Sequence, residues 1–188
     1  MAAPRTSIVL GLQFGDEGKG LTTSSLVVPK ERTLVVRFNG GHQAGHTVVK
    51  NGYRHVFSSF GSATLHGTPA TFWSRYCTFY PKAYCNEREV LRNIGIEPNF
   101  YIDPLAMVTT PFDIIANHRE EENNKHGSVG VGFGTTVKRH EETPYRIYAG
   151  DLMYEELVIH KLNQIADYYS IEERELPIKD FLEKTKTP

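Results

Sequence analysis

A short apolar run that leads into a glycine-rich turn constrains the fold of this chain most strongly. Ser7-Ile-Val-Leu-Gly11 predicts a buried strand of an α/β sheet. The turn Gly15-Asp-Glu-Gly-Lys-Gly20 follows, and residues 21–28 have a spacing compatible with a helix. A strand, a glycine-rich turn and a helix in this order place backbone N–H groups at a helix N-terminus, which favours phosphate binding.

Strand and helix patterns alternate along the rest of the chain, without an internal repeat. Strands are predicted at residues 33–38, 71–76 and 100–102, with a hairpin over 48–57 that turns at Asn51-Gly52. Helices are predicted at residues 87–94, 111–122, 153–168 and 178–183, followed by a frayed end at 184–188. Residues 127–134 carry a glycine at nearly every second position, so their backbone is either mobile or held against a ligand. The alternation predicts a three-layer α/β fold, a mostly parallel sheet flanked by helices.

Composition narrows the class of protein. The chain has 188 residues, which predicts a single domain over 1–188. Its 21 basic and 22 acidic side chains give a net charge of −1, which argues against a nucleic-acid partner. No apolar stretch approaches the roughly 20 residues of a membrane helix, and the first residues do not resemble a signal peptide. We therefore expect a cytoplasmic protein in which Cys77 and Cys85 are reduced thiols.

The first candidate site is the turn from Gly15 to Gly20. It is not a Walker A loop, because Gln13 and Gly20 replace the first glycine and the magnesium-binding hydroxyl of that motif. Asp16 and Glu17 stand inside the loop, where a carboxylate would repel a bound phosphate. Such a carboxylate is tolerated when it binds a cation or transfers a proton. The alternative is an ordinary acidic helix cap beside a glycine turn.

The second candidate site is Asn39-Gly-Gly-His-Gln-Ala-Gly-His-Thr47, which directly follows a predicted strand. Small residues let a ligand approach the backbone, and histidine donates a proton or stabilises developing charge near neutral pH. The alternative is a turn whose histidines form only local hydrogen bonds. Two loops that each follow a parallel strand meet at the carboxyl edge of a sheet, where α/β proteins bind ligands.

Three segments resemble those of the adenylosuccinate synthetase family. Gln13-Phe-Gly-Asp-Glu-Gly-Lys-Gly20 resembles the family's QWGDEGKG, with Phe14 in place of Trp. Arg37-Phe-Asn-Gly-Gly-His-Gln-Ala-Gly-His-Thr-Val48 is similar to its RxQGGxNAGHTV segment, and Ala149-Gly-Asp-Leu152 to its VGDL. The resemblance runs over residues 7–152, with helices expected from 153 to 188. It implies a P-loop-NTPase-like nucleotide-binding fold.

The resemblance also implies a reaction, the GTP-dependent conversion of IMP and L-aspartate to adenylosuccinate. In that chemistry GTP phosphorylates the 6-oxygen of IMP, and the amine of aspartate then displaces the phosphate. Carried over, Asp16 is the base and a Mg²⁺ ligand, His46 is the acid, and the Gly45 carbonyl is a second Mg²⁺ ligand. GTP, or another purine nucleoside triphosphate, and IMP are the implied partners, together with a homodimer.

Further roles follow from the same resemblance. The residues implied to contact the GTP phosphates come from both loops: Gly15, Asp16, Glu17, Gly18, Lys19, Gly20, Gly45, His46 and Thr47. Those implied to contact the IMP substrate are Lys19, Gln43, Ala44 and Ser128.

The sequence departs from the family pattern at several positions. Leu21 stands where the family has Lys, which removes one cation beside the phosphates, and Gln43 replaces Asn. The family's GI(G/R)PxYxxKxxR signature falls on residues 132–143, where Thr143 occupies the place of its final arginine. Arg139 or Arg146 replaces that arginine only if the register shifts.

The length of the chain leaves three hypotheses for its function. Family members are more than twice as long, and their second half carries the segments that bind aspartate and select guanine. The first hypothesis is a phosphoryl-transfer enzyme, either a fragment or split subunit or a shortened relative with a changed reaction. The second is a non-catalytic purine-nucleotide-binding or regulatory module, for instance one that senses purine nucleotides or pairs with a full-length synthetase. The third is an interaction domain with a decayed site, which the intact GDEGKG and AGHT segments disfavour.

The remaining aromatic and histidine residues have simpler interpretations. Aromatic residues around Trp73 are expected to form core or a partner surface rather than to stack on a base: Tyr76, Phe79, Tyr80 and Tyr84. Four histidines lack metal-ligand spacing and are expected at the surface: His118, His126, His140 and His160.

Overall fold

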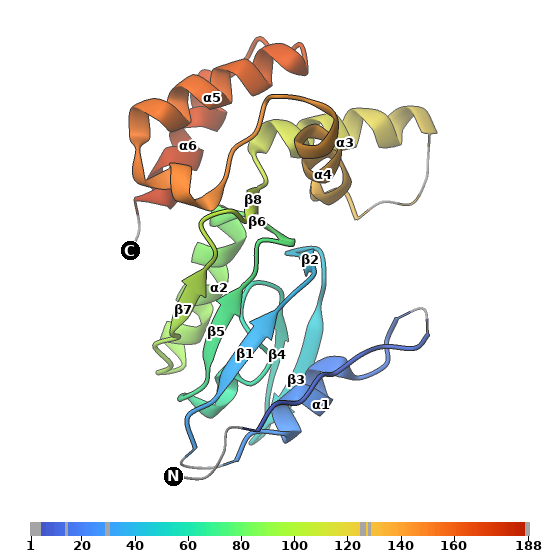
Figure 1. Cartoon of the computed structure of the whole chain (residues 1–188), viewed down its shortest axis with the longest axis vertical. Coiled ribbons are helices and arrows are strands. Elements are labelled where there is room, and N and C mark those ends of the chain that lie inside the picture. The colour runs from blue at the N-terminus through green and yellow to red at the C-terminus, as the bar shows by residue number, and fades with distance from the viewer. Residues whose placement is uncertain (1–4, 14, 29–30, 125–126, 128, 187–188) are drawn as a thin grey trace.

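The strands of this protein form small parallel sheets joined by a hairpin. The computed structural model describes residues 5–13, 15–28, 31–124, 127 and 129–186. Within these ranges one parallel sheet has the order β1 (Leu34–Arg37), β5 (Ala70–Trp73), β7 (Phe100–Ile102). The second parallel sheet has the order β2 (Gly40–Gly41), β6 (Cys77–Phe79), β8 (Met107–Val108). Figure 1 shows these sheets on one side of the molecule and the C-terminal helices on the other, which confirms a mostly parallel α/β fold flanked by helices.

The predicted hairpin is confirmed. β3 (His46–Lys50) pairs antiparallel with β4 (Tyr53–Phe57), and His46 lies opposite Phe57. Asn51 and Gly52 at its tip have φ angles of 51° and 78°. Two left-handed residues in succession match the right-handed twist of the strands, which is why Asn-Gly favours this turn.

The predicted helices are present with shifted limits. The observed helices are α1 (Lys19–Ser25), α2 (Pro81–Asn93), α3 (Pro111–Asn124), α4 (Phe133–Glu142), α5 (Glu155–Tyr168) and α6 (Glu175–Thr185), with short 3₁₀ turns η1 (Thr64–His66) and η2 (Ala149–Met153). Helices α2, α3 and α6 are longer than predicted, α5 begins two residues later, and α1 lies earlier in the chain than residues 21–28. Helix α4 was not predicted, because the glycines before it conceal its start at Phe133. No helix in the described part of the chain is both long and apolar enough to cross a membrane.

The prediction of a buried strand at Ser7–Gly11 is wrong. Residues 5–13 form neither helix nor strand, and the side chains of Ile8 and Leu10 are 74% and 63% exposed. The Arg5 guanidinium donates a hydrogen bond to the Leu26 carbonyl, so this segment runs back along α1. A buried parallel strand needs hydrogen-bonded neighbours and cover on its faces, and the described residues provide neither here.

Aromatic side chains form the centre of the core. Trp73 and Phe79 pack at a ring separation of 6.3 Å, and Tyr84 and Phe100 pack at 4.7 Å. This confirms a core role for most of the predicted aromatic cluster, whereas Tyr76 is 72% exposed. Cys77 is buried in the same core, and the two cysteines form no disulfide within the described residues.

A buried ion pair joins the helices of the C-terminal part. The Arg139 guanidinium on α4 donates to both carboxylate oxygens of Asp113 on α3, at 2.8 Å each. It also donates to the Val108 and Tyr145 carbonyls, while the Tyr169 hydroxyl donates to Asp113. Since Arg139 and Asp113 are completely buried, this network satisfies their charges without water.

His140 is not the surface residue that the sequence suggested. Its side chain is 5% exposed, and its ring packs edge-on against Tyr148 at 5.1 Å. Burial lowers the pKa of its imidazole to about 3, and the neighbouring Arg139 cation adds to this effect. His140 is therefore a neutral core residue.

We expect the substitution Arg139→Met to destabilise the fold by about 3–5 kcal/mol, because it leaves the Asp113 carboxylate buried without its counter-charge. Urea unfolding followed by circular dichroism measures this loss. Arg174→Met is the control, because its partner Asp167 is 69% exposed and such surface pairs contribute at most about 1 kcal/mol. Equal losses for both variants would contradict a structural role for the buried pair.

Candidate nucleotide-binding site

The first loop contains three residues with positive φ angles. Gly15, Asp16 and Gly18 have φ angles of 121°, 48° and 72°. Left-handed residues close together in sequence point successive N–H groups toward one side of a turn. Aspartate tolerates the left-handed region better than most non-glycine residues. Helix α1 begins directly after this turn, at Lys19.

Glu17 and Lys19 are tied together within this loop. The Lys19 ammonium donates to the Glu17 carboxylate at 2.7 Å, and the backbone N–H of Gln13 donates to the same carboxylate at 2.6 Å. The bond from Lys19 is the main reason that the pKa of Glu17 is lowered. A side chain at Gly11 would collide with both groups. Asp16 is exposed and makes no hydrogen bond or ion pair to another described residue.

The second loop connects the two sheets to the hairpin. Gly40 and Gly41 pair in parallel with Cys77 and Thr78 of β6. A Cβ atom on Gly41 would overlap the Thr78 side chain and lie 2.9 Å from the Thr78 carbonyl oxygen, so only glycine fits there. The loop then turns, with the Ala44 amide donating to the Gly41 carbonyl at 3.3 Å, and enters β3 at His46.

Arg37 connects the start of this second loop to the turn that follows the hairpin. Its guanidinium donates to the Gly41 carbonyl at 3.1 Å and to the Ser58 carbonyl at 2.6 Å. Ser58 directly follows Phe57, which pairs with His46 in the hairpin. The guanidinium also lies 4.6 Å from the centre of the Trp73 ring, a cation–π contact.

Glu87 on α2 holds the same turn from the other side. Its carboxylate accepts hydrogen bonds from the Ser58 amide and hydroxyl, and from the Ser59 amide at 2.6 Å. Buried Arg37 and buried Glu87 thus bind opposite groups of one short turn. Sequence reasoning missed both residues, although Arg37 begins the second motif. Both act on the turn at Ser58, which lies 21 residues after Arg37 and 29 residues before Glu87.

The two loops lie against each other. A Cβ atom on Gly20 would lie 2.8 Å from the His46 Cβ atom, so the first turn of α1 packs directly on the start of β3. Figure 1 shows α1 beside β3, in agreement with the contact. The structure therefore brings Gly20, at the end of the first loop, to His46, near the end of the second, although the first loop does not follow a strand.

His46 is neutral at the junction of these loops. Partial burial lowers the pKa of its imidazole, and the positive charges of Arg37 and Lys19 lower it further. The carboxylate of Glu87 opposes this shift to a smaller extent. A pKa below the ordinary value of about 6.5 leaves the ring uncharged at pH 7, with an N–H that can donate a hydrogen bond.

Several buried polar atoms in and beside the second loop have no hydrogen-bond partner among the described residues. They are the two ring nitrogens of His42, the amide oxygen of Gln43 and the hydroxyl of Thr78. Burial lowers the pKa of His42 to about 4. The backbone of Val131, in the glycine-rich segment, approaches the His42 ring without a hydrogen bond of normal geometry. Buried polar atoms without partners cost free energy, so this region is suited to a polar ligand.

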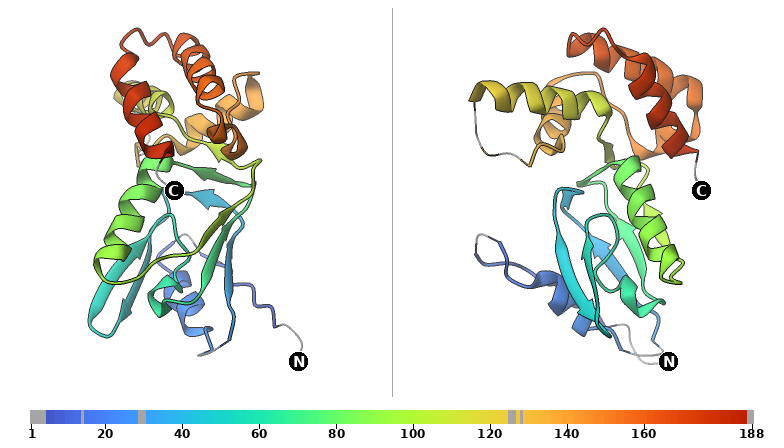
Figure 2. Two further views of the ribbon diagram at one scale, coloured as in Figure 1. Left: turned by 90° about the vertical axis from the view of Figure 1, so that its left-hand side faces the viewer. Right: turned by 180° about the vertical axis from the view of Figure 1, so that it is seen from behind.

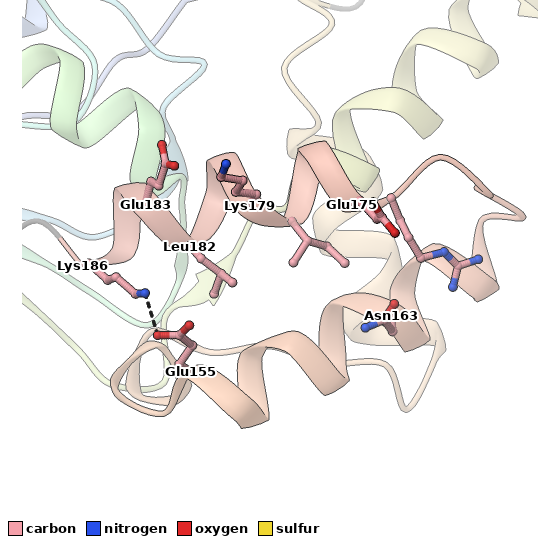
Figure 3. Close-up of a pocket in the computed structure, with 9 residues that line it drawn as sticks. Glu155, Asn163, Glu175, Lys179, Leu182, Glu183 and Lys186 are labelled. Carbon is pink, nitrogen blue, oxygen red and sulfur yellow. Dashed lines mark ion pairs between the residues drawn. The ribbon is translucent and has the colours of Figure 1, made fainter.

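Other predicted positions contribute less. Ser128 lies outside the described residues. Arg139 cannot bind a phosphate, because it is buried against Asp113, and Arg146 is exposed beside Thr143. A groove between α5 and α6 has a charged lining that includes Glu155 and Lys186, which pair at 2.9 Å (Figure 3). That groove contains no residue of the two loops.

The donor set near the first loop fits a magnesium ion bound partly by a ligand. The described residues contain no cluster of three His, Cys, Asp or Glu side chains suited to a metal. Magnesium in nucleotide sites is usually held by one or two carboxylates together with substrate phosphates. The Asp16 carboxylate is exposed and has no competing cation, whereas Glu17 is already bound to Lys19.

The mostly parallel sheets flanked by helices form an α/β fold of the P-loop-like nucleotide-binding class. A sequence model of the adenylosuccinate synthetase family matches residues 8–186. The chain therefore belongs to the adenylosuccinate synthetase family, and the match extends past residue 152, where the motif resemblance ended.

Individual relatives agree with the family assignment. An adenylosuccinate synthetase from Neisseria meningitidis is 32% identical over 177 residues, which are 92% of this chain and 40% of the relative. One from Actinobacillus succinogenes is 31% identical over 174 residues, covering 89% and 39%. The structure of fully ligated adenylosuccinate synthetase from Plasmodium falciparum superposes with a TM-score of 0.75 at 21% identity, over 94% of this chain and 43% of that one. The chain thus spans about two fifths of these relatives.

We expect the His46 imidazole to titrate below the ordinary histidine pKa, and Lys19→Met to raise its midpoint, because one nearby positive charge disappears. Two-dimensional NMR of the ring protons against pH measures both midpoints. Lys161→Met, which removes a cation from the C-terminal part, should leave the His46 titration unchanged. An unchanged midpoint in Lys19→Met would contradict the proximity of the two loops.

Proposed function

We propose that this chain binds the phosphates of a purine nucleotide with Mg²⁺ between its two loops, and supplies the phosphoryl-transfer part of an adenylosuccinate synthetase-like site. The packing of Gly20 on His46 carries the proposal, because it brings both family motifs to one place. GTP is the proposed donor and IMP the proposed acceptor. This assigns the chain to GTP-dependent ligase chemistry in purine biosynthesis.

Asp16 is the proposed metal ligand and base of this site. Its carboxylate is exposed and has no cationic partner among the described residues, so an approaching cation meets no competitor. The Gly45 carbonyl, in an exposed part of the second loop, is the proposed second ligand. Magnesium bound there would neutralise phosphate charge and thereby offset the repulsion between Asp16 and the nucleotide.

His46 and Lys19 are proposed to stabilise charge on the transferring phosphoryl group. A neutral His46 ring donates one N–H to a phosphoryl oxygen, in a direction set by the β3–β4 pairing and by Arg37. Lys19 is held by Glu17 next to the same loop. The N–H groups of Gly15, Gly18 and Gly20 are proposed to bind phosphate oxygens, and Thr47 to follow them from the second loop.

The second loop is proposed to contact the purine nucleotide that accepts the phosphoryl group. Gln43 has a buried amide oxygen without a partner, and Ala44 lies in the turn beside it. Gln43 reaches one methylene further than the family's Asn, so we expect it to contact the same ligand from a slightly different position.

A second candidate function follows from length. The chain matches only 40% of the length of a relative, and the residues described here include the two candidate loops. A non-catalytic module that binds a purine nucleotide is therefore the alternative. The two functions share the binding site and differ only in turnover.

We expect GTP with Mg²⁺ and IMP to stabilise the protein, by about 2.7 kcal/mol at a ligand concentration of 100 times Kd. Asp16→Asn should weaken binding of the magnesium nucleotide at least about tenfold, ~1.4 kcal/mol. Isothermal titration calorimetry and thermal melting measure both effects, with Asp167→Asn as a control because that exposed carboxylate lies on α5.

The ligand assays also separate the two candidate functions. Release of phosphate from GTP in the presence of IMP supports the enzyme, and binding without turnover supports the module. Absence of any thermal shift or calorimetric signal with GTP, ATP or IMP would contradict the proposed function itself. EDTA should abolish the Asp16-dependent part of nucleotide binding, because that part depends on the cation.

A further inference from the structure

One sheet of this protein is apolar on both faces but is covered on only one. In the β1–β5–β7 sheet, Arg37 and Trp73 point to the side that carries the hairpin and α2. The left view of Figure 2 shows α2 and the hairpin on that side, and the described part of the chain places no helix on the opposite side. Val36, on the opposite side of β1, pairs with Phe72 of β5.

The uncovered face consists of large apolar side chains. Leu34 and Val36 lie on this side of β1 and are 54% and 49% exposed, and Phe38, directly after the strand, is 45% exposed. Tyr101 of β7 pairs with Phe72 on the same side and is 60% exposed. We call these four exposed residues the bare face. Parallel sheets almost always have both faces covered, and a contiguous exposed apolar patch marks an interaction surface.

The edge of this sheet is open as well. Within the described residues β1 has a hydrogen-bonded neighbour on one side only, β5. The apolar segment before the first loop is also exposed, with Leu12 at 93%. An open edge and an apolar segment without a strand both indicate that further polypeptide belongs here.

The comparison with relatives indicates which polypeptide this is. The solved relative has the same fold over the part that this chain covers, and that part is 43% of its length. In this fold the matched part leaves the bare face without cover. A relative in which both faces of this sheet are shielded from water must therefore cover the bare face with residues from the remaining three fifths of its chain.

We infer that the bare face binds the polypeptide that corresponds to the remaining part of an adenylosuccinate synthetase. The inference does not depend on nucleotide binding, because contact with the bare face needs only apolar burial. It does bear on the proposed site: ordering residues 7–12 beside β1 would fix the loop that carries Asp16. A second copy of this chain is the competing occupant.

Co-expression with a relative's C-terminal part tests the inference. The full chain is produced together with a tagged polypeptide made of the residues that follow the matched region in the Neisseria meningitidis synthetase. We expect both polypeptides to co-purify in a 1:1 complex by light scattering, without added nucleotide. Val36→Lys should reduce the recovered complex at least about tenfold, because it places an unpaired charge in a buried contact.

Val49→Lys is the matched control. Val49 lies on β3 and is 58% exposed, so this substitution makes the same chemical change outside the bare face. Tyr101→Lys is the second test variant, and circular dichroism melting of all variants alone shows whether each is folded. Retention of the complex by both folded test variants would overturn the inference, as would failure of the wild-type chain to retain the tagged polypeptide.

Two further readouts separate the competing explanations. A homodimer of the chain alone that Val36→Lys dissociates would assign the bare face to a second copy and overturn the inference. Nucleotide affinity is measured separately, with and without the partner. A complex without nucleotide binding would contradict the proposed function but leave the interface standing, and nucleotide binding without a complex would do the reverse.

Discussion

The hydrogen bonds of the Arg37 guanidinium hold the candidate site together. One buried cation binds the carbonyl at the start of the second loop and the carbonyl beyond the strand that pairs with His46. Glu87 completes the arrangement by accepting the amides of the same turn. Because buried charges are costly unless satisfied, these contacts leave the loop little freedom. The position of His46, and with it the contact to Gly20, follows from this arrangement.

The two ends of the molecule are stabilised in different ways. The helical part is closed around the Asp113–Arg139 pair, whose charges are satisfied entirely by protein groups. The sheet that leads to the loops instead exposes Val36 and its neighbours, and the segment before the first loop is not in a strand. The chain therefore combines a helical part with a satisfied buried ion pair and a candidate site whose supporting sheet is covered on one side only. This contrast agrees with a family member that spans two fifths of its relatives.

The sequence allowed the motifs and the local turns to be predicted, but not the long-range contacts. The Asn51-Gly52 hairpin and the α5 helix are confirmed because their signals lie in neighbouring residues. The prediction of a strand at Ser7–Gly11 is wrong because an apolar run does not reveal whether other elements are present to pair with it and cover it. Arg139 and His140 are buried by contacts with distant elements, which spacing along the chain does not encode. For the site, the two loops were predicted to meet, whereas the roles of Arg37 and Glu87 depend on tertiary structure.

The central claim is that the two loops bind the same polyphosphate. Paramagnetic relaxation by Mn²⁺ in place of Mg²⁺ tests it most directly, because the effect of the ion on nearby protons falls steeply with distance. With GTP and Mn²⁺ bound, the account predicts strong broadening of the His46 ring protons and none of those of buried His140, with the broadening lost in Asp16→Asn. Broadening that spares His46 while the nucleotide is bound would contradict the account.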